Sequence, residues 1–256
     1  MAENGEKDIE KSKAGKPVDG KMHAFAGNSY DDYYDHAMSD FPWTARVLMN
    51  IVVYACYAFT KLVWPWKIEQ VERLVDDKRG RVIIQNHESM VDPVIMVVVL
   101  WRAGIHMRIV YKKEFDKIGI ARWLFSRVGA FPVNRGEADM KVIRRARASL
   151  QRGECLLIYP EGTRVKRDAD AEVHGGYALM AQLAKAPVQP VALVGARHLG
   201  FRSKIRLAVG EPIEWSDLAS TKRKEQVAEM EERGMAEVYR LRDELREKYP
   251  ELEAAE

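Results

Sequence analysis

The sequence predicts an α/β fold: a mixed, largely parallel sheet flanked by helices, with an N-terminal membrane-embedding helical segment and a long C-terminal helix. Short apolar runs alternate with helix-like stretches through the middle of the chain, which is typical of a sheet covered on both faces. A tryptophan-rich apolar segment precedes this alternation, and a long charged helical pattern follows it. At 256 residues the chain suits one domain with appendages.

Four segments are expected from this pattern. Residues 1–40 are polar and carry no apolar signal-peptide core, so we expect a disordered or loosely packed tail that stays on the cytosolic side. A membrane-associating helical segment follows at 41–66, then the α/β domain at 67–215. The charged helix of 216–256 is expected to pack on that domain, and a break near Gly234 stays open.

The segment 41–66 has aromatic residues at both ends, with Trp43, Trp64 and Trp66 suited to headgroup depth. Its uninterrupted apolar stretch, 51–59, is shorter than the roughly 20 residues that a membrane span needs. A buried core helix, a transmembrane anchor and a helix lying in the interface all remain open. We favour membrane embedding, with monotopic insertion ahead of a full span.

The domain itself shows six strand-like runs and four helix-like stretches before the C-terminal helix. The predicted strands are 81–85, 106–111, 130–133, 155–159, 188–194 and 204–209, and the predicted helices are 93–102, 118–128, 137–152 and 176–184. Active sites of such folds lie at the carboxyl ends of strands.

Charge and cysteine content limit the functions that the chain can have. Only Cys56 and Cys155 are present, both in apolar runs, so neither a disulfide framework nor a metal site is indicated. Residues 100–170 hold 16 Lys and Arg against 8 Asp and Glu, which is either a solvated surface or a face that attracts anions. No nucleic-acid motif accompanies this charge, so a nucleic-acid partner is not expected.

His87 and Asp92 lie five positions apart, directly after the first strand of the domain. A helix would turn them by about 140° onto different faces, whereas a loop that folds back could join imidazole and carboxylate as a base and its orienting acid. Two structural alternatives stay open. His87 could simply terminate the strand, and Asp92, just before Pro93, could be a helix N-cap.

A second strand-then-polar-loop unit ends in Glu161-Gly162-Thr163-Arg164. Arg135 likewise follows a short strand, and each arginine lies near a glycine, which suggests a divided phosphate clamp. Either arginine could instead form a surface ion pair with Glu137 or Asp168, and Glu161 could form an ion pair with Arg164. Glu161 could also accept a hydrogen bond from a polyol hydroxyl.

Together these residues resemble the glycerophospholipid acyltransferase family, and most closely its 1-acyl-sn-glycerol-3-phosphate acyltransferase branch. The first family motif, Asn-His-x-x-x-x-Asp, matches residues 86–92, and the third, Phe-Pro-Glu-Gly-Thr-Arg, matches 159–164 with Tyr159 in place of Phe. The second and fourth look like 129–135 and 186–191, with Asn134 where Asp is common. Four motifs in order make the resemblance specific.

The resemblance implies transfer of a fatty acyl group to the 2-hydroxyl of lysophosphatidic acid, forming phosphatidic acid in phospholipid biosynthesis. His87 would be the general base and Asp92 its orienting acid, without a covalent acyl-enzyme. Arg135 and Arg164 would hold the phosphate with added charge from Lys113, Glu161 would position the glycerol, and the backbone around Gly162 and Thr163 would help to build the site.

No cofactor or metal is expected beyond an acyl thioester co-substrate, carried by coenzyme A or by acyl carrier protein. The expected location is the cytoplasmic face of the cell membrane, with the phospholipid bilayer as partner. Two alternatives remain open: a different acceptor, such as glycerol 3-phosphate or another lysophospholipid, and a non-catalytic protein that binds anionic lipid at the membrane surface.

Overall fold

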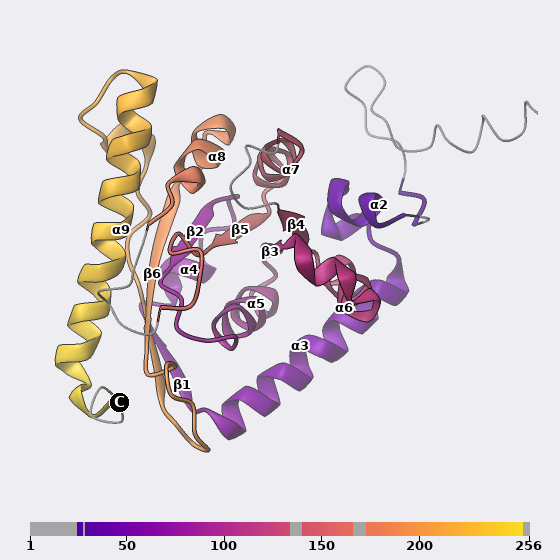
Figure 1. The fold of residues 1–256 in the computed structure, drawn as a ribbon, viewed down its shortest axis with the longest axis horizontal. Coiled ribbons are helices and arrows are strands. Elements are labelled where there is room, and N and C mark those ends of the chain that lie inside the picture. The colour runs from indigo at the N-terminus through magenta and orange to yellow at the C-terminus, as the bar shows by residue number, and fades with distance from the viewer. Residues whose placement is uncertain (1–24, 28, 134–139, 166–172, 253–256) are drawn as a thin grey trace, which may run out of the picture.

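Among the described residues, seven strands form one sheet in the order β1-β7-β6-β2-β5-β3-β4 (Figure 1). The computed structural model describes residues 25–27, 29–133, 140–165 and 173–252. Strands β6 and β7 are antiparallel, and all other neighbouring pairs are parallel. The strands are β1 (Trp66–Glu69), β2 (Val82–Gln85), β3 (Met107–Lys112), β4 (Phe131–Val133), β5 (Cys155–Ile158), β6 (Val188–Val194) and β7 (Ile205–Val209). The predicted mixed, largely parallel sheet is confirmed.

Helices cover both faces of this sheet (Figure 1). One hydrophobic core joins α3 and α5 to the sheet, and a second joins α7, α8 and α9 to its opposite face. The α-helices are α2 (Tyr30–Asp35), α3 (Trp43–Val63), α4 (Glu72–Val75), α5 (Asp92–Arg102), α6 (Gly119–Arg127), α7 (Met140–Gln151), α8 (Gly176–Ala184) and α9 (Arg223–Lys248). Short 3-10 turns are η1 (Met38–Asp40), η2 (Lys113–Lys117), η4 (Trp215–Asp217) and η5 (Pro250–Leu252).

Strand β2 shows why the sheet needs cover on both sides. Ile83 packs into the core under α3 and α5, whereas Val82 and Ile84 pack into the core under α7 to α9, because successive side chains point to opposite faces. Hydrogen bonds join β2 to β5 on one side and to β6 on the other. The loop that begins at Asn86, directly after β2, therefore leaves the sheet near its centre.

The six predicted strands all form, each within one residue of its predicted ends, and the helices of the domain agree equally well wherever their residues are described. Strand β1 and helix α4 were not predicted, because each is only four residues long and gives no clear periodicity. Pairing of β1 with β7 buries Trp66, whose indole N–H donates to Thr60 Oγ1 at 3.1 Å. The expected headgroup position of Trp66 is therefore wrong.

The C-terminal helix packs on the domain as expected, but it begins at Arg223 rather than at 216. The carboxylate of Glu229 accepts the backbone N–H groups of Ala219 and Ser220, which holds this stretch outside the helix. The possible break at Gly234 does not occur. A β-carbon there would lie 2.7 Å from Tyr177 Oη and 2.9 Å from Ile84 Cδ1, so the glycine allows α9 to approach closely.

The expectation of a disordered segment up to residue 40 is wrong for residues 29–40. Helix α2 begins with a capping box at Ser29, and Tyr33, Tyr34 and Met38 are buried. The fully buried Arg108 of β3 donates to the carbonyl of Tyr33 at 2.9 Å and to that of His36. Residues 1–24 lie outside the described residues.

The Arg108 guanidinium also pairs with Glu154, by bonds of 3.0 Å from Nε and 3.1 Å from Nη2. Glu154 in turn accepts the backbone N–H of Met38 at 2.7 Å. This buried ion pair therefore joins the N-terminal segment to β3 and to the start of β5. The polar composition of residues 1–40 gave no sign of this attachment.

Helix α3 is long and apolar enough to cross a membrane, by length and composition. Its inner face, with Ala45, Met49 and Val53, packs into the core beside α5. The outer face exposes large apolar side chains: Trp43, Val47, Ile51, Tyr54, Phe59 and Leu62. Figure 1 shows α3 running along the outside of the domain, which fits a helix with one core face and one unpartnered apolar face.

Replacing Glu154 by Ala leaves the buried Arg108 guanidinium without its carboxylate, and we expect the free energy of unfolding to fall by about 3–5 kcal/mol. Replacing Arg79, whose guanidinium is exposed in its pairs with Asp77 and Glu214, by Ala is the control and should cost about 1 kcal/mol or less. Urea denaturation measures both. Equal losses for the two variants would contradict the structural role of the buried pair.

Candidate active site

The loop after β2 folds back as predicted and brings His87 and Asp92 into contact. His87 Nδ1 lies 2.9 Å from Asp92 Oδ2. The same carboxylate oxygen accepts the backbone N–H groups of Glu88 and Ser89, each at 2.8 Å. These bonds run back into the loop rather than forward into α5, so the N-cap alternative for Asp92 is wrong. Pro93 does occupy the first turn of the helix, as expected.

Asp92 is fully buried at the N-terminus of α5. Burial raises the pKa of this carboxyl, while the hydrogen bonds from His87 and from the amides of Ser89 and Glu88 act in the opposite direction. The positive end of the helix dipole also favours a negative charge here. With three N–H groups directed at one oxygen, the site is built for a carboxylate.

The loop after β5, which carries the third motif, holds His87 by its main chain. Glu161 Oε2 accepts the His87 backbone N–H at 2.7 Å, and the Val165 N–H donates to the His87 carbonyl at 2.8 Å. Because β2 and β5 are adjacent and parallel, the two loops leave the same edge of the sheet. The predicted convergence of the two motifs is therefore observed.

Glu161 is buried, and the predicted alternative of an ion pair with Arg164 is absent among the described residues. Its other oxygen lies 3.3 Å from the hydroxyl of Tyr239 on α9. Burial raises the pKa of Glu161, and the bonds from His87 and Tyr239 oppose that shift. Helix α9 thus supports the site as well as packing on the sheet, a role that its charge pattern did not indicate.

Tyr159 is the site residue that sequence reasoning noticed only as a departure from a motif. Its ring stacks on the His87 imidazole, with centroids 4.1 Å apart and planes inclined by 26°. Its hydroxyl is buried, and burial together with the charge of Asp92 raises the pKa of this phenol well above its ordinary value. The aromatic ring fixes one face of the imidazole.

Gly162 and Thr163 form the turn that follows. Gly162 has a φ of +66°, which favours glycine, and a β-carbon there would lie 2.9 Å from the His174 ring, which would have to move. The Thr163 N–H donates to the Glu161 carbonyl at 2.7 Å, and its side chain is exposed.

Arg164 and Lys113 are exposed, and neither side chain forms a hydrogen bond or ion pair with another described residue. Lys113 begins η2 directly after β3, which lies beside β5 in the sheet. Strand β4 is parallel to β3, so its carboxyl end at Val133 lies at the same edge of the sheet. Arg135 itself lies outside the described residues. The carboxyl ends of β3, β4 and β5 thus lie at one edge of the sheet, but of the two arginines of the predicted clamp only Arg164 is among the described residues.

The loop that carries His87 is also fixed from the other side. Asn86 exchanges two hydrogen bonds of 2.8 Å with the backbone of Leu193 in β6. Glu88 accepts the Ala196 N–H at 2.9 Å and lies 3.6 Å from Arg197 Nε. Burial is the main cause that raises the pKa of Glu88 to about 7.

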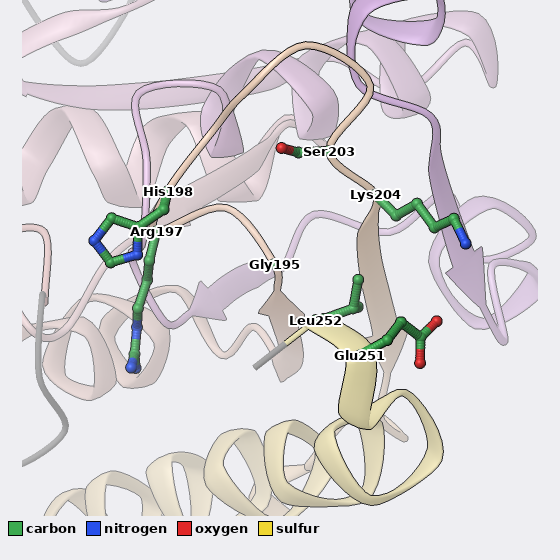
Figure 2. A pocket seen from close by; sticks show the side chains of 7 residues that line it. All are labelled: Gly195, Arg197, His198, Ser203, Lys204, Glu251 and Leu252. Atoms are coloured by element: carbon green, nitrogen blue, oxygen red, sulfur yellow. The ribbon is translucent and has the colours of Figure 1, made fainter. Parts of the chain in front are cut away.

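A cavity of about 210 Å³ lies beyond Arg197, between the loop after β6 and the η5 turn. In Figure 2, Arg197 and His198 stand on one side of this cavity and Lys204 and Glu251 on the other. None of the motif residues lines it. The catalytic candidates therefore lie on the open edge of the sheet and not in this hollow. Among the described residues, no group of three His, Cys, Asp or Glu side chains is placed to hold a metal ion.

Comparison with known proteins agrees with the motifs. Residues 67–194 match the sequence model of the acyltransferase family. The chain is 33% identical over 170 residues to a 1-acyl-sn-glycerol-3-phosphate acyltransferase of Bacillus subtilis, covering 65% of this chain and 82% of that protein. A protein of the same name from Streptococcus pneumoniae is 28% identical, over 57% of this chain and 55% of its own length. A lyso-ornithine lipid O-acyltransferase of Pseudomonas aeruginosa is 32% identical over 43% of this chain and 41% of its own.

The fold also matches a solved structure. The crystal structure of a 1-acyl-sn-glycerophosphate acyltransferase from Thermotoga maritima aligns with a TM-score of 0.62 at 22% identity, over 79% of this chain and 81% of that one. At that identity the likeness concerns the fold. The family model matches half of the chain, and the match to the Bacillus protein covers more than two thirds of that protein's length. The chain therefore belongs to the glycerophospholipid acyltransferase family.

Proposed function

We propose that the chain transfers a fatty acyl group from an acyl thioester to the 2-hydroxyl of 1-acyl-sn-glycerol 3-phosphate. The product would be phosphatidic acid, as the names of the Bacillus and Streptococcus relatives suggest. His87 acts as general base, Asp92 orients it, and the substrate alkoxide attacks the thioester carbonyl directly. The observation that carries this proposal is the 2.9 Å contact between His87 Nδ1 and the buried Asp92 carboxylate.

That contact determines which ring nitrogen is available for chemistry. A neutral imidazole that donates its Nδ1–H to Asp92 keeps its lone pair on Nε2, so Nε2 accepts the proton of the attacking hydroxyl. The carboxylate then stabilises the imidazolium that forms. The same proton returns to the leaving thiolate, so neither a covalent acyl-enzyme nor a cofactor is needed.

Binding of the acceptor phosphate is assigned to the exposed cations at the same strand ends. Arg164 offers a guanidinium that no described residue neutralises, and Lys113 adds an ammonium from the neighbouring strand. Arg135 is proposed as the second arginine of the clamp. Glu161 is turned inward to the His87 main chain, so we assign it first to positioning the base; its predicted contact with the glycerol remains a prediction.

Both substrates carry acyl chains, and helix α3 suits a bilayer surface on which to meet them. Its exposed stripe from Trp43 to Leu62 is apolar, while its other face is committed to the domain core. A helix with this division lies in the plane of the interface rather than across it. We therefore propose monotopic docking at the cytoplasmic face of the cell membrane. Coenzyme A and acyl carrier protein both remain candidates for the thioester carrier.

Replacing His87 by Ala should lower the rate of acyl transfer to lysophosphatidic acid by about 10²- to 10⁴-fold, because the general base is lost. The assay presents labelled acyl thioester to purified protein with lysophosphatidic acid, glycerol 3-phosphate or a lysophospholipid with a larger headgroup. Only lysophosphatidic acid should give product with the wild type. His198→Ala, which removes an exposed histidine outside the four motifs, is the matched control and should retain full activity.

If only another acceptor gave product, that acceptor would take the place of lysophosphatidic acid in the proposal. The 32% identity to a lyso-ornithine lipid acyltransferase makes the test of other acceptors informative. Wild-type turnover in the His87→Ala protein would reject the assignment of the base. No product with any acceptor would favour the lipid-binding alternative.

Replacing Arg164 by Ala should raise the KM for lysophosphatidic acid by about 10- to 100-fold while leaving the KM for the thioester unchanged, since a charge-assisted contact to one substrate is removed. Steady-state kinetics with each substrate varied in turn makes the distinction. The control is Arg147→Ala, an exposed arginine on α7. An unchanged acceptor KM would exclude Arg164 from the clamp.

A further inference from the structure

A second cavity, of about 350 Å³, lies at the far end of α5 from the catalytic pair. Asp92 begins this helix and Arg102 ends it, so the cavity and the base lie about 15 Å apart along the helix axis. Its lining comes from α3, β1, α4 and α5: Tyr57, Lys61, Trp66, Ile68, Val71, Val75, Val99, Arg102 and Ala103. Its volume is in the range of small-molecule sites.

Two cations line this cavity, and each lies against an aromatic ring. The Lys61 ammonium stands 3.4 Å above the centre of the Trp66 ring and donates to the Trp66 carbonyl at 2.6 Å. The Arg102 guanidinium stands 4.1 Å from the centre of the Tyr57 ring. These contacts hold both charges in place without neutralising them.

The charges that act on Lys61 are themselves positive. Burial is the main cause that lowers the pKa of Lys61, and repulsion by Arg102, Lys67 and Arg206 acts in the same direction. No carboxylate forms an ion pair with Lys61 or Arg102 among the described residues. A cluster of cations beside an apolar hollow is complementary to an anion that carries hydrocarbon.

The cavity is continuous with the apolar stripe proposed to meet the membrane. Tyr57 and Lys61 lie in the last two turns of α3, where Phe59 and Leu62 are 57% and 65% exposed. Figure 1 shows α3 beside α5 and leading into β1, the three elements that meet around this hollow. A helix lying on a bilayer would therefore bring lipid headgroups to Lys61 and Arg102.

We propose that this cavity binds one anionic phospholipid of the membrane, separately from the acyl acceptor. The lipid phosphate lies between the Lys61 ammonium and the Arg102 guanidinium, and hydrocarbon covers the apolar wall of Ile68, Val75 and Val99. The proposal rests on the proposed docking of α3 at a membrane. It makes that docking tighter on anionic bilayers.

A structural role for the same residues is the competing explanation. Lys61 and Arg102 lie in the last turns of α3 and α5, where a cation stabilises the helix dipole. Such a role would appear as a loss of thermal stability, without an effect on lipid affinity. Binding and stability must therefore be measured on the same variants.

The probe is short-chain phosphatidylglycerol below its critical micelle concentration, titrated calorimetrically into the full chain, with glycerol phosphate as a headgroup-only probe. The lipid should bind saturably at one site, and Lys61→Gln/Arg102→Gln should weaken this binding by about 30-fold, given the usual strength of two basic residues at an anionic lipid surface. Arg223→Gln/Lys224→Gln removes two exposed cations at the start of α9 and should change nothing. Undiminished binding in the first variant, equal loss in the second, or equally tight binding of glycerol phosphate would overturn the proposal.

Vesicle sedimentation separates this inference from the membrane docking on which it rests. With neutral phosphatidylcholine vesicles, Ile51→Glu/Leu62→Glu should abolish binding, whereas Lys61→Gln/Arg102→Gln should bind like wild type. With added phosphatidylglycerol, only the wild type should gain affinity. A wild type that ignores neutral vesicles would contradict the docking alone, and equal gains for the wild type and Lys61→Gln/Arg102→Gln would contradict the lipid site alone.

Discussion

A single carboxylate oxygen organises the candidate active site. Asp92 Oδ2 accepts the imidazole Nδ1–H of His87 and the main-chain N–H groups of Glu88 and Ser89, so one buried charge closes the loop and selects the tautomer of the His87 imidazole. The neighbouring loop then holds the main chain of His87 through Glu161 and Val165. Without that charge, the imidazole N–H and the two main-chain N–H groups would lose their common acceptor.

The sequence predicted those parts of the site that local spacing controls. Five positions between His87 and Asp92 exclude a helix, and placement after a strand in an α/β pattern gives the edge of the sheet. It did not predict Tyr239 as a partner of Glu161, because α9 reaches the site only through the packing of the whole sheet. The ordered structure of residues 29–40 was not predicted for a similar reason. The Arg108–Glu154 pair that binds them lies far away in the sequence.

Helix α5 connects catalysis with the proposed membrane surface. Its first residue is Asp92, its length packs against α3, and its last residue, Arg102, borders the cavity proposed for an anionic lipid. One face of α3 packs against α5 and the other is exposed. The domain would therefore rest on a bilayer with the Asp92 carboxylate held at a fixed height. The acyl chains of both substrates could then stay in the membrane while their polar ends reach His87.

The central claim is that the negative charge of Asp92, and not only its shape, supports the base. Asp92→Asn keeps the size of the side chain and one oxygen for the loop amides, but it removes the charge that stabilises the imidazolium. Acyl transfer to lysophosphatidic acid should then show a kcat lower by about 10²- to 10⁴-fold, with the acceptor KM changed by no more than about twofold. A kcat close to that of the wild type would contradict the account.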